Sequence, residues 1–338
     1  MTQKTMLDAL GPDALGELVS RREAVARGVK VSAFTRAALA LGSVPVAIGA
    51  LAGIARAQPA TSTIVDVLQY ALLLENFEAE FYKAVLGTSS VAAFNDAFAT
   101  VRAAASANAA AVGTLTLLRD HEVKHVSALQ ATITALGATP ATYAPAATFD
   151  FTGGRGSGAG AFAPATQDLG FLLAVTQTVE DTGVRAYKGQ AGKLLGTPTL
   201  TTALQIHSLE ARHAARIRRI RRVLGTAVGA DTTAVRAAGL VKGGAAAAAG
   251  AALTASATVP AASITALTSA AALVYANENN TSHTASTGTV DAAALPALPQ
   301  GTDPTMAFDE PLTALQVRDI VQPFVIPDIT LGTSLANG

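Results

Sequence analysis

Two Glu-x-x-His motifs are the residues of this sequence best suited to chemistry: Glu122 with His125, and Glu210 with His213. On a helix, residues three apart lie on one face, so each motif can present a carboxylate and an imidazole to a common point. The chain has only 5 His, and independent placement would give about 0.15 such pairs by chance. The repeated motif therefore indicates a metal site with carboxylate and imidazole ligands.

A second repeated spacing places a tyrosine seven residues after a glutamate, in Glu75 with Tyr82 and in Glu180 with Tyr187. The two kinds of motif alternate along the chain, which indicates an internal duplication of a pair of helices. Residues seven apart lie two turns along the same helical face. We take Tyr82 and Tyr187 as candidate catalytic residues that hydrogen-bond a ligand carboxylate or act as redox-active phenols. The alternative is two core aromatic side chains with satisfied hydroxyls.

The four motifs together supply four carboxylates and two imidazoles. This is the ligand set of di-iron and di-manganese helical bundles, in which two helices give one glutamate each and the other two give Glu-x-x-His. Four carboxylates balance the charge of two divalent ions, whereas without metal they would repel one another and take up protons. We therefore predict a centre of two Fe ions, or two Mn ions. The predicted ligands are Glu75, Glu122, His125, Glu180, Glu210 and His213.

Other side chains near these motifs leave alternatives open. Glu78 lies about one turn from Glu75 and is the alternative ligand on its helix, although the residue seven positions on is Val85 and not a tyrosine. His121 and His207 have no glutamate three residues before them, which places them outside the ligand set. The six predicted ligands could also be unrelated surface residues, but their ordered spacing favours one site.

The elements that must position these residues are four long helices. Apolar residues at helical spacing predict helices over 64–86, 114–136, 167–195 and 198–224. Gly87 and Gly137 supply the ends of the first two, and another helical stretch over 92–111 is predicted to break near Gly113. The segment 138–164 is rich in Gly, Pro and Thr. One long connection in the middle of four helices is the ferritin-like topology, so the predicted fold is an all-α bundle with one long crossover.

The composition limits the functions that the chain can have. It has 338 residues, of which 50% are hydrophobic, and this is enough for a buried core. Lys+Arg and Asp+Glu are 24 each, and no basic segment is rich in aromatic residues, so we do not expect nucleic-acid binding. The chain has no cysteine, which removes disulfides, iron–sulfur clusters and thiol catalysis. Any metal must be held by Glu, Asp and His.

Shifts in composition divide the chain into three predicted regions. The four-helix bundle should lie between an N-terminal export signal and a C-terminal extension that packs on the bundle. This extension is irregular and rich in Ala and Gly, with low complexity around 243–252. The predicted boundaries are 1–57 for the signal, 58–225 for the bundle and 226–338 for the extension.

The predicted export signal has a charged region, an apolar region over 33–55 and the small-residue site Ala55-Arg56-Ala57, in that order. Its paired Arg21 and Arg22 resemble the twin-arginine (Tat) signal, although Glu23 stands where that signal has a bulky apolar residue. Cleavage would leave a mature N-terminus near Gln58, a periplasmic or extracellular protein, and no stable membrane span. The alternative is an uncleaved membrane anchor.

The residues around the motifs resemble the ferritin-like domain family that is described as desiccation-related. This resemblance covers about 64–224, and 275–280 and 307–312 resemble the family's C-terminal extension. Its members are largely exported bacterial proteins, similar in bundle and ligand pattern to bacterioferritin, rubrerythrin and manganese catalase. The resemblance implies a ferritin-like fold and a role in oxidative or desiccation stress, without fixing an activity. The matching residues are Leu74, Glu75, Glu78, Phe81, Tyr82, His121, Glu122, His125, Val126, Glu180, Asp181, Gly183, Val184, Ala186, Tyr187, Glu210 and His213.

Two classes of function fit these observations. In the first, two Fe²⁺ ions react with O₂ or H₂O₂, as a ferroxidase or in peroxide removal, or two Mn²⁺ ions dismutate H₂O₂. In the second, the chain is a non-catalytic envelope or matrix protein that protects the cell in stress or desiccation. An iron-storage cage is disfavoured, because its subunit must be compact with bare outer faces, and the tail and the Ala/Gly-rich insert do not fit this requirement. A homo-oligomer is compatible with the sequence.

Overall fold

The computed structural model describes residues 59–224, 259–274, 282–285, 288–291 and 311–336. The predicted export signal and the low-complexity part of the extension lie outside these residues. In the described part of the chain, none of the helices has the length and apolar character that crossing a bilayer requires.

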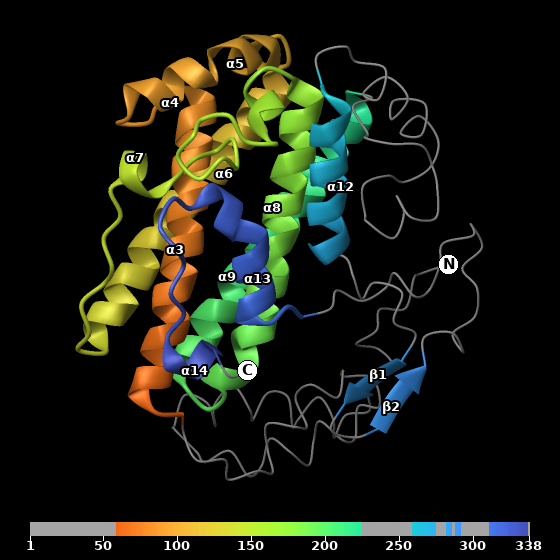
Figure 1. Cartoon of the computed structure of the whole chain (residues 1–338). Helices are drawn as coiled ribbons and strands as arrows, with labels where there is room; N and C mark the ends of the chain where they lie inside the picture. The colour runs from red at the N-terminus through yellow and green to blue at the C-terminus, as the bar shows by residue number, and fades with distance from the viewer. Residues whose placement is uncertain (1–58, 225–258, 275–281, 286–287, 292–310, 337–338) are drawn as a thin grey trace, which may run out of the picture. The chain divides into compact units, whose positions relative to one another are not determined.

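Four long helices form the body of the molecule (Figure 1). They are α3 (Thr61–Leu86), α6 (Ala109–Ala135), α8 (Leu169–Gln190) and α9 (Pro198–Val223). Along most of its length α3 packs against α6, and α8 packs against α9 in the same way. The predicted all-α fold is therefore confirmed, with each pair of motifs on one pair of neighbouring helices.

Glycine ends two of these helices, as predicted. Gly87 and Gly137 have φ angles of 75° and 79°, in the left-handed region that favours glycine. After α3, Gly87 N–H donates to Ala84 O at 3.0 Å and Thr88 N–H donates to Lys83 O at 2.8 Å. These two bonds form a Schellman motif, which satisfies carbonyls that the helix end would otherwise leave unpaired.

The start of α6 differs from the prediction. Short helices α4 (Ala92–Ala97) and α5 (Ala99–Ser106) precede it, and the chain breaks at Asn108, whereas Gly113 lies inside α6. The Asn108 side chain accepts a hydrogen bond from Ala111 N–H at 3.0 Å. A capping side chain satisfies a free N–H of the first turn, so it defines a helix start more strongly than glycine, which costs only about 1 kcal/mol inside a helix.

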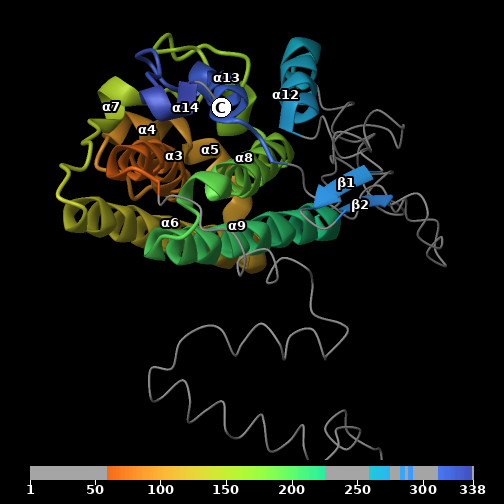
Figure 2. The same cartoon turned by 90° about the horizontal axis from the view of Figure 1, so that it is seen from below.

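The helices and the C-terminal segment form layers (Figure 2). In this view α6 and α9 lie side by side, α3 and α8 lie above them, and α13 (Ala314–Val321) and α14 (Thr333–Ala336) lie on the far side of α3 and α8. The contacts agree, because α13 packs on α8 and α14 on α3. The helix α6 accordingly buries one stripe at spacings of three and four residues. The stripe consists of Ala111, Leu115, Leu118, Glu122, His125, Leu129 and Ile133.

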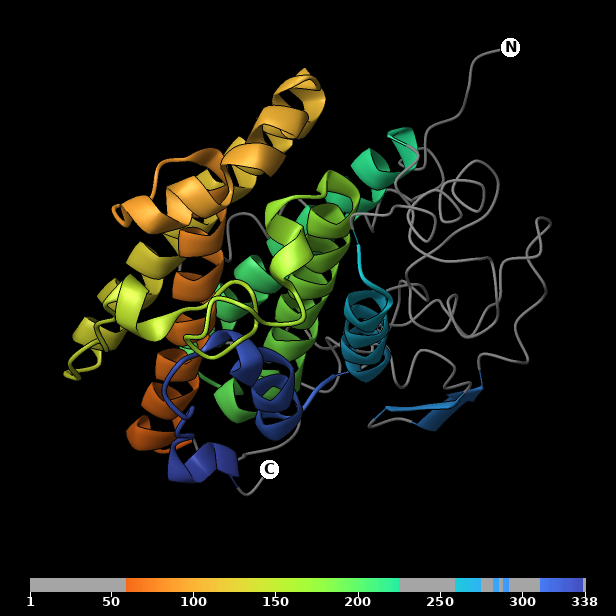
Figure 3. The same cartoon turned by 45° about the horizontal axis from the view of Figure 1, so that its top comes forward.

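The long connection between α6 and α8 passes along α3 (Figure 3). It contains α7 (Pro145–Thr148) and the 3-10 turn η4 (Ala163–Thr166). Its Asp150 carboxylate accepts hydrogen bonds from the N–H groups of Gly156 and Gly158, at 2.7 and 3.1 Å. These bonds fix the conformation of the glycine-rich loop.

Described parts of the C-terminal extension contact the bundle. Helix α12 (Ala261–Val274) packs against α8 and α13. The 3-10 turn η8 (Gln322–Phe324) follows α13, and Phe149 of the long connection forms an antiparallel bridge with Val325. Strands β1 (Ser282–Ala285) and β2 (Gly288–Asp291) pair in a two-stranded sheet that belongs to a separate unit.

Candidate metal centre

All six predicted ligands lie in the core of the bundle. Their side chains come from all four long helices, two from α6, two from α9 and one each from α3 and α8. Each residue is at most 6% exposed, and Glu122, Glu180 and Glu210 are at 0%. Carboxylates are rarely buried to this degree unless they are paired or bind a metal.

The six side chains form two overlapping groups. In each group, one potential ligand atom per residue lies within 4.8 Å of every other. Glu122 and Glu210 belong to both groups, whereas the remaining members divide between them. The first group adds Glu75 and His125, and the second adds Glu180 and His213.

Each histidine points one ring nitrogen at the carboxylates. His125 Nδ1 lies 3.0 Å from Glu75 Oε2 and 2.8 Å from Glu122 Oε2. His213 Nδ1 lies 2.9 Å from Glu122 Oε1 and 3.2 Å from Glu180 Oε2. Both Nδ1 atoms therefore face the middle of the cluster, where a lone pair on neutral imidazole could bind a cation.

Three carboxylate oxygens in the cluster have no hydrogen-bond partner among the described residues: Glu122 Oε1 and both oxygens of Glu210. The close approach of His213 to Glu122 Oε1 is not aligned as a hydrogen bond. A buried oxygen without a partner costs about 1 to 3 kcal/mol, and more if it is charged. These oxygens belong to the two residues that both groups share, so they are donors that a cation in either group could use.

Burial and mutual repulsion control the protonation of the cluster. Burial raises the pKa of Glu210 well above its usual value, and the neighbouring carboxylates raise it further. Burial likewise raises the pKa of Glu122, against the effect of its contact with His213. Burial lowers the pKa of His213, but Glu180 and Glu122 outweigh this and raise it to about 9. Without a cation, the cluster therefore retains protons that two metal ions would displace.

Glu75 differs from the other carboxyls of the cluster. Burial raises its pKa, but the hydrogen bond and the charge of His125 outweigh this effect, helped by a hydrogen bond from Tyr187. The net pKa of Glu75 is below its usual value. This carboxylate is therefore held ionised and oriented before any cation binds.

The two tyrosines hydrogen-bond across the bundle. Tyr187 on α8 donates its hydroxyl to Glu75 Oε1 on α3 at 2.5 Å. Tyr82 on α3 donates in the same way to Glu180 Oε1 on α8. Burial raises the pKa of both phenols well above 10, and the neighbouring carboxylates reinforce the shift. The hydroxyls are thus neutral donors that orient the two carboxylates.

His121 lies closer to the cluster than its sequence context indicated. Its Nδ1 is 2.9 Å from His213 Nε2, on the side of that ring away from the carboxylates. Histidines that bind metals usually donate their second ring N–H to an acceptor, which fixes the tautomer, and Nδ1 of a neutral His121 can be that acceptor. Spacing along one helix could not identify His121, because the contact joins α6 to α9. His207 instead places Nδ1 2.9 Å from Val184 O, outside the cluster.

Glu78 is buried but belongs to neither group of potential ligands. Of the two candidates on α3, it is therefore Glu75 whose carboxylate contacts a histidine of the cluster, His125. Gly183 also borders the cluster, because a Cβ atom at this position would lie 2.8 Å from Glu210 Oε2. Only a residue without a side chain leaves the Glu210 carboxylate its present place.

Fold and cluster together define a helical bundle whose buried carboxylates and imidazoles could bind metal. Residues 63–223 match the family model described as a ferritin-like domain. The match spans nearly all of the four long helices and includes all six clustered residues, and it stops before the C-terminal extension. The match supports the conclusion that this is a ferritin-like protein. Comparison of the chain with curated proteins and with solved structures gave no match.

Proposed function

We propose that this ferritin-like protein binds two Fe ions, or two Mn ions, in the buried cluster and uses them to react with O₂ or H₂O₂. The observation that carries the proposal is the overlap of the two groups at Glu122 and Glu210, which hold the three carboxylate oxygens without a hydrogen-bond partner. Oxygen and nitrogen donors of this kind suit both metals, so the donor set does not choose between them.

The cluster divides into two positions with shared carboxylates. Glu75 and His125 would hold one ion, Glu180 and His213 would hold the other, and Glu122 and Glu210 would contribute to both. Four carboxylates neutralise two divalent ions, which removes the repulsion that burial imposes on the metal-free cluster. The cluster therefore matches two divalent ions in charge as well as in the number of ligands.

When bound, two Fe²⁺ ions supply two electrons that reduce H₂O₂ to water with two protons, and Mn²⁺ pairs would instead dismutate H₂O₂. The protein orients the ligands and excludes water. Tyr82 and Tyr187 hold the two unshared carboxylates, and their rings beside the cluster make them the candidate redox-active residues. The apolar core around them keeps the site dry, which strengthens every charge interaction within it.

We also propose, from the sequence, that the protein acts outside the cytoplasm after loss of its N-terminal segment. Mass spectrometry of protein recovered from the envelope or the medium should find an N-terminus near Gln58. An intact Met1 in envelope protein would support an anchor instead.

Metal analysis joined to oxidant consumption tests the proposed function. Purified protein should bind two Fe or Mn ions per chain and consume O₂ or H₂O₂, and His213→Ala should lose both properties. His207→Ala is the matched control, because this histidine lies on the same helix but outside the cluster. Metal binding without oxidant consumption would favour the non-catalytic protective protein, and absence of metal binding would refute the centre itself.

A further inference from the structure

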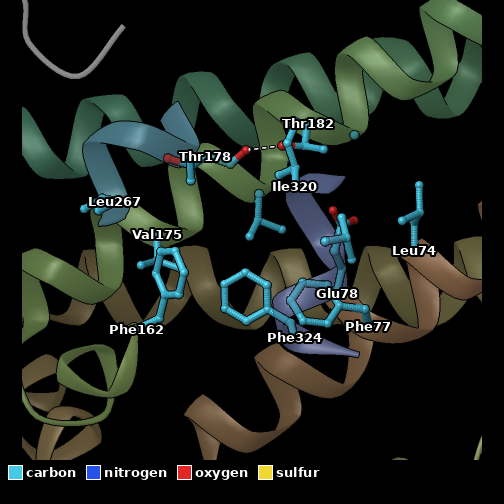
Figure 4. A pocket seen from close by; sticks show the side chains of 14 residues that line it. Leu74, Phe77, Glu78, Phe162, Val175, Thr178, Thr182, Leu267, Ile320 and Phe324 are labelled. Carbon is cyan, nitrogen blue, oxygen red and sulfur yellow. Dashed lines mark hydrogen bonds between the residues drawn. The ribbon is translucent and has the colours of Figure 1, made fainter. Parts of the chain in front are cut away.

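A small cavity lies beside the cluster, enclosed by α3, α8, α12 and α13 together with Phe162 and Phe324 (Figure 4). It offers about 30 Å³ to the centres of water-sized molecules, and one water needs about 10 to 15 Å³ on that measure. The walls are apolar side chains such as Val175, Leu267 and Ile320. The cavity therefore has room for a molecule of two or three non-hydrogen atoms.

Glu78 is the one carboxyl group among the residues that line this cavity. It is 4% exposed, and Figure 4 shows its carboxyl pointing from α3 into the cavity. In the described part of the chain, no group hydrogen-bonds or ion-pairs with it. The hydroxyls of Thr178 and Thr182 are bonded to carbonyls of their own helix. A buried carboxyl of this kind is costly unless a bound molecule satisfies it.

The lining of the cavity includes partly exposed residues as well as a residue that borders the cluster. At its outer side, Val179 of α8 and Ala270 of α12 are both partly exposed. It is also lined by Gly183, where an added Cβ atom would lie 2.8 Å from Glu210 Oε2. A molecule in the cavity would therefore lie beside Gly183, which borders the shared Glu210 carboxylate.

We propose that this cavity is the chamber through which H₂O₂ reaches the metal centre, and that Glu78 is the group that binds it there. The proposal rests on the proposed function, because it names the oxidant and its route to the same cluster. Glu78 acts here as a binding residue.

The chemistry of the chamber favours H₂O₂ over the alternatives. Burial raises the pKa of Glu78 well above its usual value, and the charges of Glu122, Glu180 and Glu75 raise it further. A neutral carboxyl offers one donor and one acceptor, which H₂O₂ can match with its own hydroxyls. Apolar walls exclude ions, whereas O₂ would leave the carboxyl as unsatisfied as an empty chamber does.

Substitutions at Glu78 test the binding group in the metal-loaded full-length protein. Glu78→Leu should slow oxidation by H₂O₂ by about three- to tenfold, the loss expected for one hydrogen bond, and should change oxidation by O₂ by less than about twofold. Glu78→Gln keeps a neutral donor and acceptor and should restore the rate with H₂O₂. Unchanged rates in Glu78→Leu, or equal losses with both oxidants, would overturn H₂O₂ as the occupant.

Stability separates this role from a structural one. Replacing a buried carboxyl that has no partner by an apolar side chain of similar size should leave the melting temperature equal or higher. A slower but equally stable Glu78→Leu protein therefore supports the chamber. A destabilised variant would assign Glu78 to the core and overturn the proposal.

A matched pair on α12 tests the route. Ala270→Phe should fill the mouth and slow the reaction with H₂O₂, whereas Ala272→Phe, at an exposed position two residues on, should not. Equal rates in the two variants would overturn this entry path.

Infrared spectroscopy of the metal-free protein supplies a readout that needs no activity. The difference between wild type and Glu78→Leu isolates the C=O band of Glu78, and added H₂O₂ should shift this band while O₂ should not. An unshifted band would overturn the chamber even if the metal centre is active. A protein that binds no metal but shows the shift would refute the proposed function and leave the peroxide site standing.

Discussion

The two halves of the bundle carry the same ligands in different surroundings. The α3–α6 half and the α8–α9 half each supply Glu-x6-Tyr and Glu-x-x-His, and each tyrosine binds the glutamate of the other half. Three residues after the first glutamate, however, one half has Glu78 and the other has Gly183. Before the Glu-x-x-His motif, one has His121 and the other has Leu209.

The predicted ligand set is therefore duplicated, but the surroundings of the two proposed metal positions differ. Glu78 of α3 and Gly183 of α8 both line the cavity through which we propose that the oxidant approaches. His121 contacts His213 and gives one histidine a partner that can fix its tautomer. Substitutions in matched pairs can therefore increase or remove the differences between the two halves of the bundle.

Loss of both histidines should have the largest effect. Metal at 100 times its dissociation constant should stabilise the wild-type protein by about 2.7 kcal/mol per site. His125→Ala with His213→Ala should abolish this stabilisation, because each of the two positions loses its imidazole. Thermal unfolding with and without Fe²⁺ or Mn²⁺ measures the effect, and circular dichroism should show intact helices. A double variant that responds to metal like the wild type would contradict the two-position centre.

Removal of metal should make stability depend on pH. The pKa of His213 is raised from 6.5 to about 9, so its contribution, on the order of 3 kcal/mol, is present below pH 6.5 and lost as the pH rises through 9. Glu122 and Glu210 have raised pKa values as well, so their ionisation destabilises the fold increasingly above their unfolded value of about 4.3.

Both effects have the same sign, so metal-free protein should lose stability steadily between about pH 5 and pH 9. Urea unfolding at a series of pH values checks this, with metal-loaded protein as the control that should show a flatter dependence. A metal-free protein that becomes more stable as the pH rises across this range would contradict the assigned shifts.

The two tyrosines offer a matched comparison of the halves. Each Tyr→Phe change removes one hydrogen bond to a buried carboxylate, worth about 1.5 to 3 kcal/mol when the acceptor is charged. Tyr82 is fully buried and Tyr187 only partly, so water can replace the lost donor more easily at Tyr187. Chemical unfolding should therefore show a larger loss for Tyr82→Phe. The reverse order would mean that exposure does not decide the difference.

Replacing His121 by Leu gives both halves the same residue before Glu-x-x-His. If His121 fixes the tautomer of His213, metal affinity at that position should fall about tenfold, and the other position should keep its affinity. Calorimetric titration with Mn²⁺ would then resolve two classes of site. The converse variant, Leu209→His, places a histidine before the Glu-x-x-His motif of α9 and so also gives both halves the same residue. A uniform loss at both positions in His121→Leu would argue against a local role.

Two glycines in helices should give the smallest effects on stability. Gly113 lies on α6 with open space where a Cβ atom would be. Gly113→Ala should therefore stabilise the protein by about 0.5 to 1 kcal/mol without changing metal affinity. Gly183→Ala gains the same helix propensity, but its Cβ would lie 2.8 Å from Glu210 Oε2 and must displace that carboxylate. Metal affinity should therefore fall in Gly183→Ala alone. Equal affinities in the two variants would show that Glu210 can move freely.

Much of the bundle could be predicted from the sequence, because the signals are local. Gly87 and Gly137 end their helices in the left-handed conformation that glycine tolerates, and a single long connection fixes the order of the helices. The break at Asn108 was missed, since a side-chain cap outweighs a glycine that lies in open space. The convergence of the six residues follows from periods of three and seven on helices that pack in pairs.

Only the tertiary structure decided what surrounds that cluster. Helical periodicity says which residues share a face, but it does not say which segment distant in the chain will cover that face. The contact of His121 with His213 joins α6 to α9, and the chamber at Glu78 exists because α12 and α13 pack on α8. The spacing of residues along one helix predicts neither feature, because both depend on packing between elements far apart in the sequence.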